Sequence, residues 1–434
     1  MRLAYFSPLN PQKSGISDYS EELLPALAKG AEIDLFVDGF SPSNKALADL
    51  FEIHDYRKRP ECLDTLDHYD AVVCQMGNNH RYHRGIYEVA TRNAAIIVFH
   101  DIAFQHFFLE RARELRDYAL YLDELEASEG VGIRVEAEEA IARGEAPPQY
   151  QNPLGFPMNF RLANQAEGII VHSEWSRSRL ERVAPGVPVV KIEHHVKIPG
   201  AESHTAGKNE GERLSIASFG FITASKGFES ALRALAALRP DHKFHYYLVG
   251  EPDSYFDIHE LTRLYGVSDC VSITGYVSFD EFNRRIAHTD IALNLRDQTV
   301  GETSGSLCRL MAAAVPTLVS NIGWFSELPD DCLIKIGPGP DADLLICAYL
   351  KELSENPDLR RQIGANARAL METNHSVEQT AADYLEFVSY VIARRANRAF
   401  VESVSADLAR LSNVEPNELL LGSVARSVTD LLSP

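Results

Sequence analysis

The sequence predicts an α/β protein of two domains, each built on a doubly wound parallel sheet. Three observations predict this fold class. The chain has 434 residues, more than one hydrophobic core usually holds. Short, almost wholly apolar runs alternate with segments of helical composition, as expected for strands buried on both faces of a sheet. Residues 198–213 are rich in Pro, Gly, Ser and charge, which is typical of a linker between two domains.

The first series of strands and helices predicts a domain over residues 1–197. Its expected strands are 2–7, 33–37, 71–74, 95–99, 168–171 and 189–192. Prolines and Gly15 force a loop after the first strand, and Ser17 or Asp18 can cap the helix that follows. Residues of about 107–160 are acidic and mostly helical, with a break at Gly130-Val131-Gly132, and predict a surface helical insertion.

The second series predicts a domain over residues 214–375. Its expected strands are 215–218, 244–249, 271–274, 291–295, 317–319 and 333–336, with a helix at 228–238. Residues 376–434 look mainly helical. Because 381–393 is amphipathic, we expect the C-terminal helices to pack partly back on the first domain.

Composition excludes several classes of protein. The formal net charge of −20 argues against binding nucleic acid, because no basic stripe can replace the counterions of phosphate. No apolar run approaches the roughly 18 residues that span a bilayer, and the short apolar N-terminus suits a first strand better than a signal peptide. The six cysteines lack CxxC spacing, which favours free buried thiols and a cytoplasmic protein; they are Cys62, Cys74, Cys270, Cys308, Cys332 and Cys347. The net charge does not rule out a local basic patch, so peripheral contact with the inner face of a membrane stays open.

Two turns in the second domain point to an anionic ligand. Gly301-Glu302-Thr303-Ser304-Gly305-Ser306 lies between a strand and a helix, where backbone N–H groups converge, with a serine or threonine cap expected and Arg296 just before it. Residues 219–227 form a similar turn that carries Lys226. Two such turns, each with a cation, fit a diphosphate and together predict a sugar-nucleotide site. The alternative is that both are ordinary structural turns.

The first domain places polar residues at strand ends as well. Residues 75–80 follow the third expected strand, and His100-Asp101 follows the fourth. Because carboxyl ends of parallel strands share one edge, Gly15, Asn79 and His100 should lie together there. A histidine at a strand end is often structural, and that interpretation stays open. No HExxH or paired Cys/His spacing is present, so no metal site is predicted.

Taken together, these motifs resemble the retaining glycosyltransferases of family 4, which have the GT-B fold. The resemblance covers roughly residues 1–390. It rests on the order and spacing of Ser14-Gly15-Ile16-Ser17-Asp18-Tyr19, His100-Asp101, Val171-His172-Ser173-Glu174, Gly220 with Lys226-Gly227, Gly275-Tyr276-Val277, Gly301 to Gly305, Ala314-Val315-Pro316 and Gly323-Trp324.

The resemblance implies two Rossmann-like domains facing a central cleft, with extra C-terminal helices. His100, Glu302 and Lys226 would be catalytic: His100 near the transferred sugar, Lys226 on the leaving diphosphate, Glu302 holding the donor. The implied donor-binding residues are Gly15, Gly220, Lys226, Gly227, Gly250, Tyr276, Val277, Arg296, Glu302, Thr303, Ser304 and Gly305, and the acceptor-side residues are Asp18, Asn79 and Asp101. Such enzymes use no metal and no cofactor, and retention is usually explained by departure of the diphosphate from the front face.

Two positions depart from the family pattern. Phe221 stands where the family usually has an arginine, so Arg296 becomes the candidate for a second phosphate cation. The family's second acidic residue, which grips the ribose, is replaced by Leu310 or Arg309, depending on how the segment is aligned. The missing acid leaves the ribose contact, and with it the identity of the nucleotide, open.

The expected function is transfer of a sugar from a nucleotide-diphosphate donor to a glycan, lipid-linked or other hydroxyl acceptor, with retention, in bacterial surface polysaccharide assembly. Sugar, base, linkage and oligomeric state are left open. The alternatives are a non-catalytic GT-B nucleotide-sugar-binding or scaffold subunit and a GT-B epimerase or phosphorylase. A two-lobed solute-binding protein would need an export signal.

Overall fold

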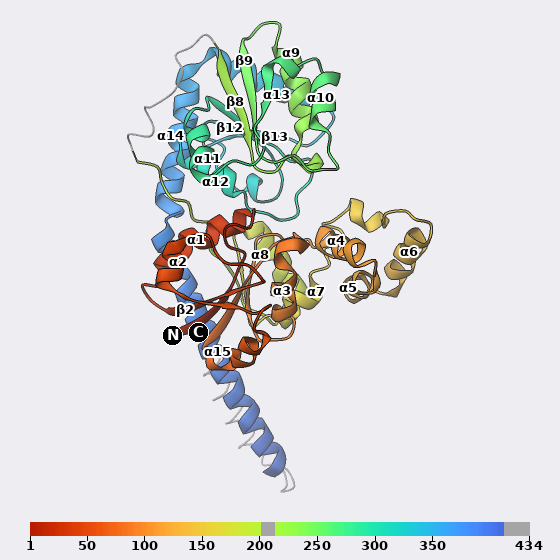
Figure 1. Ribbon diagram of the computed structural model, residues 1–434, viewed down its shortest axis with the longest axis vertical. Helices are drawn as coiled ribbons and strands as arrows, with labels where there is room; N and C mark the ends of the chain where they lie inside the picture. The colour runs from red at the N-terminus through yellow and green to blue at the C-terminus, as the bar shows by residue number, and fades with distance from the viewer. Residues whose placement is uncertain (201–212, 412–434) are drawn as a thin grey trace, which may run out of the picture.

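The structure, a computed structural model, describes residues 1–200 and 213–411, with side chains described up to residue 395. Figure 1 shows two α/β units, the first (red to yellow) below and the second (green) above, with a long C-terminal helix alongside. The predicted α/β class with two doubly wound sheets is confirmed. Most of the predicted linker, residues 201–212, and the chain end, 412–434, lie outside the described residues.

The first sheet has seven parallel strands in the order β3-β2-β1-β4-β5-β6-β7. The strands are β1 Arg2–Phe6, β2 Glu32–Val37, β3 Glu52–Asp55, β4 Ala71–Met76, β5 Ile96–Phe99, β6 Gly168–Val171 and β7 Val189–Lys191. Strand β3 was not predicted from sequence, because it is a half-exposed edge strand with polar residues rather than an apolar run. The order reverses between β1 and β4, where ligands bind in sheets of this kind.

Helices cover both faces of this sheet. The helical segments are α1 Gly15–Leu27, α2 Lys45–Leu50, η1 Pro60–His68, α3 His80–Ala90, α4 Gln105–Leu115, α5 Ala119–Glu129, α6 Val131–Ala142, η2 Pro148–Gln151, α7 Phe160–Gln165 and α8 Glu174–Val183. Gly130, at φ 88°, separates α5 from α6, as the sequence predicted. Figure 1 shows α4, α5 and α6 projecting to one side of the first unit.

Alternating side chains of β1 enter two separate cores. Leu3 and Tyr5 pack with α1 and with the C-terminal helix α15 Val377–Leu411 on one face. Ala4 and Phe6 pack on the opposite face, among residues of α3 and α4. This period of two explains why the strand is apolar throughout. It also anchors α15, which follows the second sheet in the chain, on the first sheet.

The second sheet has six parallel strands in the order β10-β9-β8-β11-β12-β13. The strands are β8 Leu214–Phe219, β9 Phe244–Val249, β10 Val271–Ile273, β11 Ile291–Asn294, β12 Thr317–Ser320 and β13 Ile334–Ile336. The helical segments are η4 Ala224–Lys226, α9 Phe228–Leu238, α10 Ile258–Leu264, η5 Ser268–Cys270, α11 Phe279–Ala287, α12 Gly305–Ala312, η6 Gly323–Ser326, α13 Ala342–Glu355 and α14 Pro357–Asn374. The order again reverses, here between β8 and β11.

The two described crossings between the units are bonded to each other. After β7 the chain leaves the first unit, and before α15 it returns. The Val196 N–H donates to the His375 carbonyl at 2.9 Å, and His375 Nδ1 lies 2.7 Å from the His194 carbonyl oxygen. These contacts fix the crossings side by side at the base of the cleft.

The cysteines are free, and four of the six are buried; Cys62 and Cys347 are partly exposed. Within the part of the chain that the structure describes, no helix is long and apolar enough to cross a membrane.

Candidate active site

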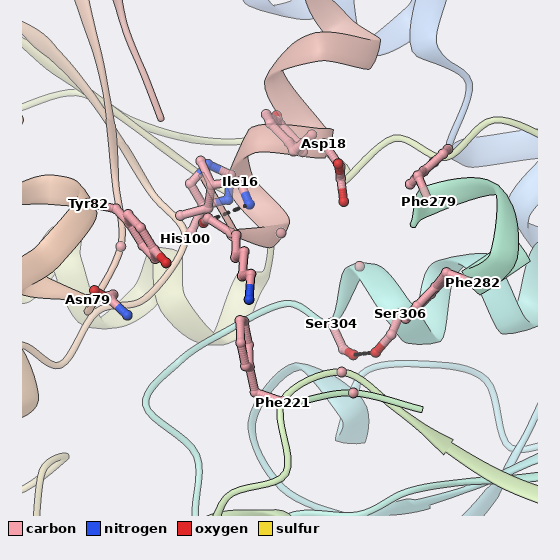
Figure 2. A pocket seen from close by; sticks show the side chains of 18 of the residues that line it. Ile16, Asp18, Asn79, Tyr82, His100, Phe221, Phe279, Phe282, Ser304 and Ser306 are labelled. Atoms are coloured by element: carbon pink, nitrogen blue, oxygen red, sulfur yellow. Dashed lines mark hydrogen bonds between the residues drawn. The ribbon is translucent and has the colours of Figure 1, made fainter. Parts of the chain in front are cut away.

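A cavity of about 870 Å³ lies between the carboxyl edges of the two sheets. Its walls come from the segments after β1, β4 and β5 in the first domain and after β8, β9 and β11 in the second. Figure 2 shows Asp18, Asn79, Tyr82 and His100 on one side and Phe221, Ser304 and Ser306 on the other. The structure therefore brings both strand-end sets predicted from sequence into one cleft.

Nearly every residue predicted for the site lines this cavity. Those that do are Gly15, Asp18, Asn79, His100, Asp101, Gly220, Lys226, Gly250, Tyr276, Val277, Arg296, Glu302, Thr303, Ser304 and Gly305. Gly227 does not: it lies behind the wall, and an added Cβ would be 2.9 Å from Leu295 Cβ. With φ at +60°, Gly227 serves the turn that leads into α9.

The helix cap after β1 differs from the prediction. Ser14, not Ser17 or Asp18, is the N-cap of α1, and its Oγ accepts from the Ile16 N–H at 3.2 Å. Ser17 is buried and donates to the Gln12 carbonyl at 3.0 Å. Asp18 is thereby free to face the cavity, where it accepts from Asn10 Nδ2 at 3.1 Å and where burial raises its pKa. Several polar residues in one loop could each cap the helix, so the local pattern did not decide between them.

Gly15 and Gly250 are glycines for different reasons. A Cβ added at Gly15 would meet nothing within 4 Å, so this residue simply leaves its side of the cavity open. A Cβ added at Gly250 would lie 2.0 Å from the Gly220 carbonyl oxygen. The loops after β8 and β9 can therefore pack together only with glycine at 250.

His100 and Asp101 follow β5 and have unusual surroundings. His100 Nε2 lies 2.7 Å from Gln75 Oε1, which holds the ring in place. Burial, followed by the nearby His172, lowers the pKa of His100 well below its ordinary value, so the ring is neutral at physiological pH. Burial raises the pKa of Asp101 to about 7, although its Oδ2 accepts from the Asn78 N–H at 2.7 Å.

Lys226 presents an unpaired amine to the cavity. The structure gives its Nζ no hydrogen bond or ion pair with any described residue, yet the side chain is only partly exposed. Burial, with a smaller contribution from the Arg296 charge, lowers the pKa of Lys226 to about 7. A cation in that position is available to an anionic ligand.

Arg296 is less available than the sequence suggested. Its Nε donates to Glu302 Oε1 at 3.0 Å, and its Nη1 donates to the Leu295 carbonyl at 2.7 Å. The guanidinium also lies over the Phe325 ring, 5.4 Å from the ring centroid. Two of its five N–H bonds are thus occupied, and the group is held in the wall of the cavity. The predicted contact of Arg296 with a phosphate stays a prediction.

The Glu302 carboxylate is hydrogen-bonded within the loop between β11 and α12. Besides Arg296, its carboxylate accepts from Thr299 Oγ1 at 2.7 Å and from the Val300 N–H at 2.9 Å. The predicted contact of Glu302 with a donor stays a prediction as well. The contacts observed here show how the loop between β11 and α12 keeps its shape.

Helix α12 begins at the cavity. Ser304 is its N-cap, accepting from the Leu307 N–H at 3.3 Å, as the predicted serine or threonine cap requires. The N–H groups of Gly305 and Ser306 make no hydrogen bond to the described residues. A helix start with free N–H groups is a place where an anion binds.

The loop before α12 also docks on the first domain. The N–H groups of Ile102 and Ala103 donate to the Val300 carbonyl at 2.9 and 3.1 Å, and Ser176 Oγ donates to the Gly301 carbonyl at 3.0 Å. A Cβ added at Gly301 would lie 2.4 Å from Ile102 Cγ1, so the contact requires glycine. The geometry of the loop therefore depends on both domains.

Two ion pairs join the domains across the cavity. Arg309 and Glu22 form a bidentate pair at 3.1 and 2.9 Å, with side chains only 13% and 16% exposed. Lys13 pairs with Glu251 at 2.7 Å and lies over the Tyr276 ring. Arg309, which replaces the expected ribose-binding acid, thus contacts a carboxylate of the other domain. Sequence reasoning missed both pairs, because the partners are far apart in the chain.

The described residues include one group of three side chains close enough to share a metal ion, Asp34, Glu52 and His54. It lies on β2 and β3, and none of the three lines the cavity. Asp34 already accepts from Arg2 Nη2 at 2.7 Å and from the Tyr69 hydroxyl at 2.5 Å. This group has no connection with the candidate active site.

Comparison with known proteins gives a family match to the second domain and several similar structures. Residues 213–348 match the family model described as Glycosyl transferases group 1. The structure is similar to that of sucrose-phosphate synthase from Thermosynechococcus elongatus, at 15% identity and a TM-score of 0.63, over 91% of this chain and 100% of that one. It is similar to HepE of Anabaena, solved in complex with UDP, at 14% identity and a TM-score of 0.62, over 90% and 100% of the two chains.

A third similar structure is that of WaaG, a glycosyltransferase involved in lipopolysaccharide biosynthesis, at 15% identity and a TM-score of 0.58, over 88% of this chain and 99% of that one. None of the curated proteins compared with the chain matches it. At these identities the structural similarity shows the fold. The paired sheets with a cleft between them, and the similarity to these structures, show a GT-B fold. The family match, residues 213–348, covers most of the second domain.

Proposed function

We propose that the protein transfers a sugar from a nucleoside diphosphate donor to a hydroxyl acceptor, with retention of configuration. One observation carries the proposal: the unpaired amine of Lys226 and the free N–H groups at the start of α12 line the same cavity as His100. The second domain thus offers an anion site, and the first domain offers neutral and acidic groups opposite it. A diphosphate and a sugar need this combination.

In the proposed reaction the bond between the sugar C1 and the diphosphate oxygen breaks, and its electron pair leaves with the phosphate. The acceptor oxygen forms the new bond to C1 on the same face, and its proton passes to the departing phosphate oxygen. The phosphate gains negative charge as the bond breaks. Lys226 and the N–H groups of Gly305 and Ser306 stabilise that charge, which lowers the barrier.

His100 is proposed to position the transferred sugar. Its Nε2 is fixed by Gln75, and a ring that stays neutral can bond a sugar hydroxyl without repelling the developing positive charge at C1. The proposed reaction needs no metal ion, because the cation and the helix N–H groups already face the leaving group.

The nature of the substrates draws support from the neighbours. HepE has been solved with UDP-glucose, and WaaG is involved in lipopolysaccharide biosynthesis. We therefore propose a nucleotide-sugar donor and a glycan or lipid-linked acceptor, in surface polysaccharide assembly at the cytoplasmic side of a bacterial membrane.

The proposal is tested by changing Lys226 to Ala and titrating nucleoside di- and monophosphates by calorimetry. Loss of one charge-assisted contact, about 1.5–3 kcal/mol, corresponds to roughly a 10- to 150-fold weaker diphosphate. Monophosphate affinity should change much less, because Lys226 is proposed to contact the second phosphate. Equal losses for both ligands would contradict this placement.

A non-catalytic nucleotide-sugar-binding subunit is the second candidate. Phe221 stands where the family usually has an arginine, and Arg296 is bonded to Glu302. The cavity wall therefore has few free cations, which favours this candidate. Tight diphosphate binding without release of sugar from any nucleotide sugar would support this candidate over the enzyme.

A further inference from the structure

His194 occupies a place in the cavity wall that no sequence motif indicated. It lies in the crossing segment between the domains, just before the bonded pair of Val196 and His375. Its residue is 8% exposed, and it lines the cavity. A Cβ added at Gly305, the first residue of α12, would lie 3.3 Å from His194 Nε2. The ring therefore faces the helix start that carries the free N–H groups.

The two ring nitrogens of His194 have distinct surroundings. Nδ1 lies 2.8 Å from the His195 carbonyl oxygen, so Nδ1 carries the hydrogen and donates it. The structure gives Nε2 no hydrogen bond to any described residue. A histidine that is more than nine-tenths buried as a residue, with an unpartnered ring nitrogen directed at a helix start, indicates a ligand that fills the space between them.

Among the described lysines and arginines that line the cavity, Lys226 is the one without a hydrogen bond or ion pair to the protein. Phe221 follows Gly220 in the turn after β8, and Arg296 is held by Glu302 and by the Leu295 carbonyl. Lys226 contributes one cation. A diphosphate that gains charge on leaving is stabilised better by a second cation close to α12.

We propose that His194 is this second cation, formed when the neutral imidazole takes up a proton as the donor diphosphate binds. The inference rests on the proposed function. The proton comes from solvent and attaches to Nε2, which then donates a charge-assisted hydrogen bond to a phosphate oxygen. Nδ1 keeps its bond to His195, so the ring need not turn.

The surroundings of His194 explain why its ring is neutral before a phosphate binds. Burial, followed by the nearby His172, lowers its pKa well below the ordinary value. The titratable and charged side chains around it are Tyr19 on α1, His100 after β5, His172 after β6, Arg309 on α12, His375 before α15, and Glu193 and His195 beside it in the chain. The carboxylates near this group are already paired, Glu193 with Lys191 and Glu22 with Arg309. A bound phosphate would supply the missing negative charge and raise the pKa of His194.

The test is calorimetric titration of a nucleoside diphosphate in two buffers of equal pH and different ionisation enthalpy. The difference in apparent enthalpy counts the protons taken up on binding. Lys226 also takes up protons, because its pKa in the empty site is about 7. The decisive quantity is therefore the difference between the wild type and His194→Gln, which keeps hydrogen-bonding capacity without the charge.

We expect His194→Gln to bind the diphosphate roughly 10-fold or more weakly and to take up measurably fewer protons than the wild type. The matched control is His245→Gln, a half-buried histidine on β9 that does not line the cavity and should leave both quantities unchanged. Lys226→Met should keep the proton uptake that belongs to His194. This variant tests the inference even where position 194 does not tolerate glutamine.

Two results would overturn the inference, and they can be told apart. If the wild type binds diphosphate and His194→Gln matches it in affinity and proton uptake, His194 is no cation and the proposed function still stands. If the wild type binds no nucleoside diphosphate at all, the proposed function and the inference fail together.

Discussion

Lys226 lies in surroundings that disfavour its own charge. The amine has no partner among the described residues, burial lowers its pKa from 10.5 to about 7, and the Arg296 guanidinium adds repulsion. Groups shifted this far are often found where a ligand completes the electrostatics. At the residue scale, the buried charge of Lys226 therefore lowers the stability of the folded protein, and the same charge is proposed to bind the donor.

Lys226→Met should raise the stability of the ligand-free protein, and more so at pH 6.5 than at pH 9. The pKa of Lys226 is lower in the folded protein than in the unfolded chain, so between about 7 and 10.5 the unfolded chain binds more protons. The wild type therefore gains stability as pH rises through this window, whereas the variant lacks that gain. Denaturant unfolding at the two pH values measures the difference.

The control for this prediction is Lys351→Met, which removes an exposed lysine. Its effect on stability should be small at both pH values. An equal effect of Lys226→Met at pH 6.5 and pH 9 would show that the Lys226 amine is not shifted.

At the scale of the elements, α12 is the part of the fold that prepares the anion site. Its Ser304 cap fixes the first turn, Ser304 Oγ lies 3.1 Å from Ser306 Oγ, and the loop before it is closed by Glu302. The N–H groups of Gly305 and Ser306 are thus aimed before any ligand arrives. Groups that need no reorganisation stabilise a leaving phosphate most effectively.

Ser304→Ala should cost both stability and ligand affinity. Loss of an N-cap costs about 1 kcal/mol, within a range of about 0.5–2. Because the cap also aligns the free N–H groups, diphosphate binding should weaken as well. Denaturant unfolding and calorimetry measure the two effects.

A matched control is Asn356→Ala. Asn356 caps α14 in the same domain, accepting from the Leu359 N–H at 3.0 Å, and does not line the cavity. Its loss should lower stability by a similar amount and leave diphosphate affinity unchanged. If both variants bind the diphosphate as tightly as the wild type, the start of α12 is not the anion site.

At the scale of the whole molecule, the two domains contact each other across the cleft. The Glu22–Arg309 pair, the Lys13–Glu251 pair and the bonds from Ile102 and Ala103 to Val300 all cross the cleft. The crossings at Val196 and His375 lie at its base. These contacts hold the two halves of the cavity wall together.

Glu22→Gln should favour conformations in which the two domains lie further apart. The change leaves the Arg309 guanidinium without its carboxylate in a place where it is 13% exposed, at a cost of about 1.5–3 kcal/mol. Small-angle scattering should give a larger radius of gyration for the variant, and donor should partly restore the compact form. Asp269→Asn removes an exposed pair with Arg239 within one domain and should leave scattering unchanged. Identical scattering for Glu22→Gln and the wild type would show that this pair does not hold the domains together.

The sequence was informative where a residue's role depends on its neighbours in the chain. Strands such as β5 Ile96–Phe99 are apolar and buried on both faces, and turns with glycine or polar residues follow the predicted strands, so the two sheets and most cavity residues could be predicted. The half-polar edge strand β3 gave no such signal. The cap of α1 fell on Ser14 because several polar residues of that loop could serve equally well.

Contacts between distant segments could not be predicted. Arg296 was predicted as a free phosphate cation, but in the structure it bonds Glu302. Arg309 stands where an acidic residue was expected, and only the structure shows that it bonds Glu22 of the other domain. His194 has no motif around it and gains its place only because a crossing segment meets α12. The Arg309–Glu22 pair and the place of His194 depend on how the two domains meet, and the Arg296–Glu302 bond depends on how the loop before α12 folds back. Local periodicity encodes neither.

The proposed sugar transfer is tested most directly by release of nucleoside diphosphate from a panel of nucleotide sugars in excess EDTA, compared between the wild type and His100→Ala. The wild type should release the diphosphate without a divalent metal. His100→Ala should release it much more slowly at nearly unchanged diphosphate affinity, because His100 belongs to the domain opposite the anion site. Binding without release from any nucleotide sugar, or wild-type release by His100→Ala, would show that the protein does not act as proposed.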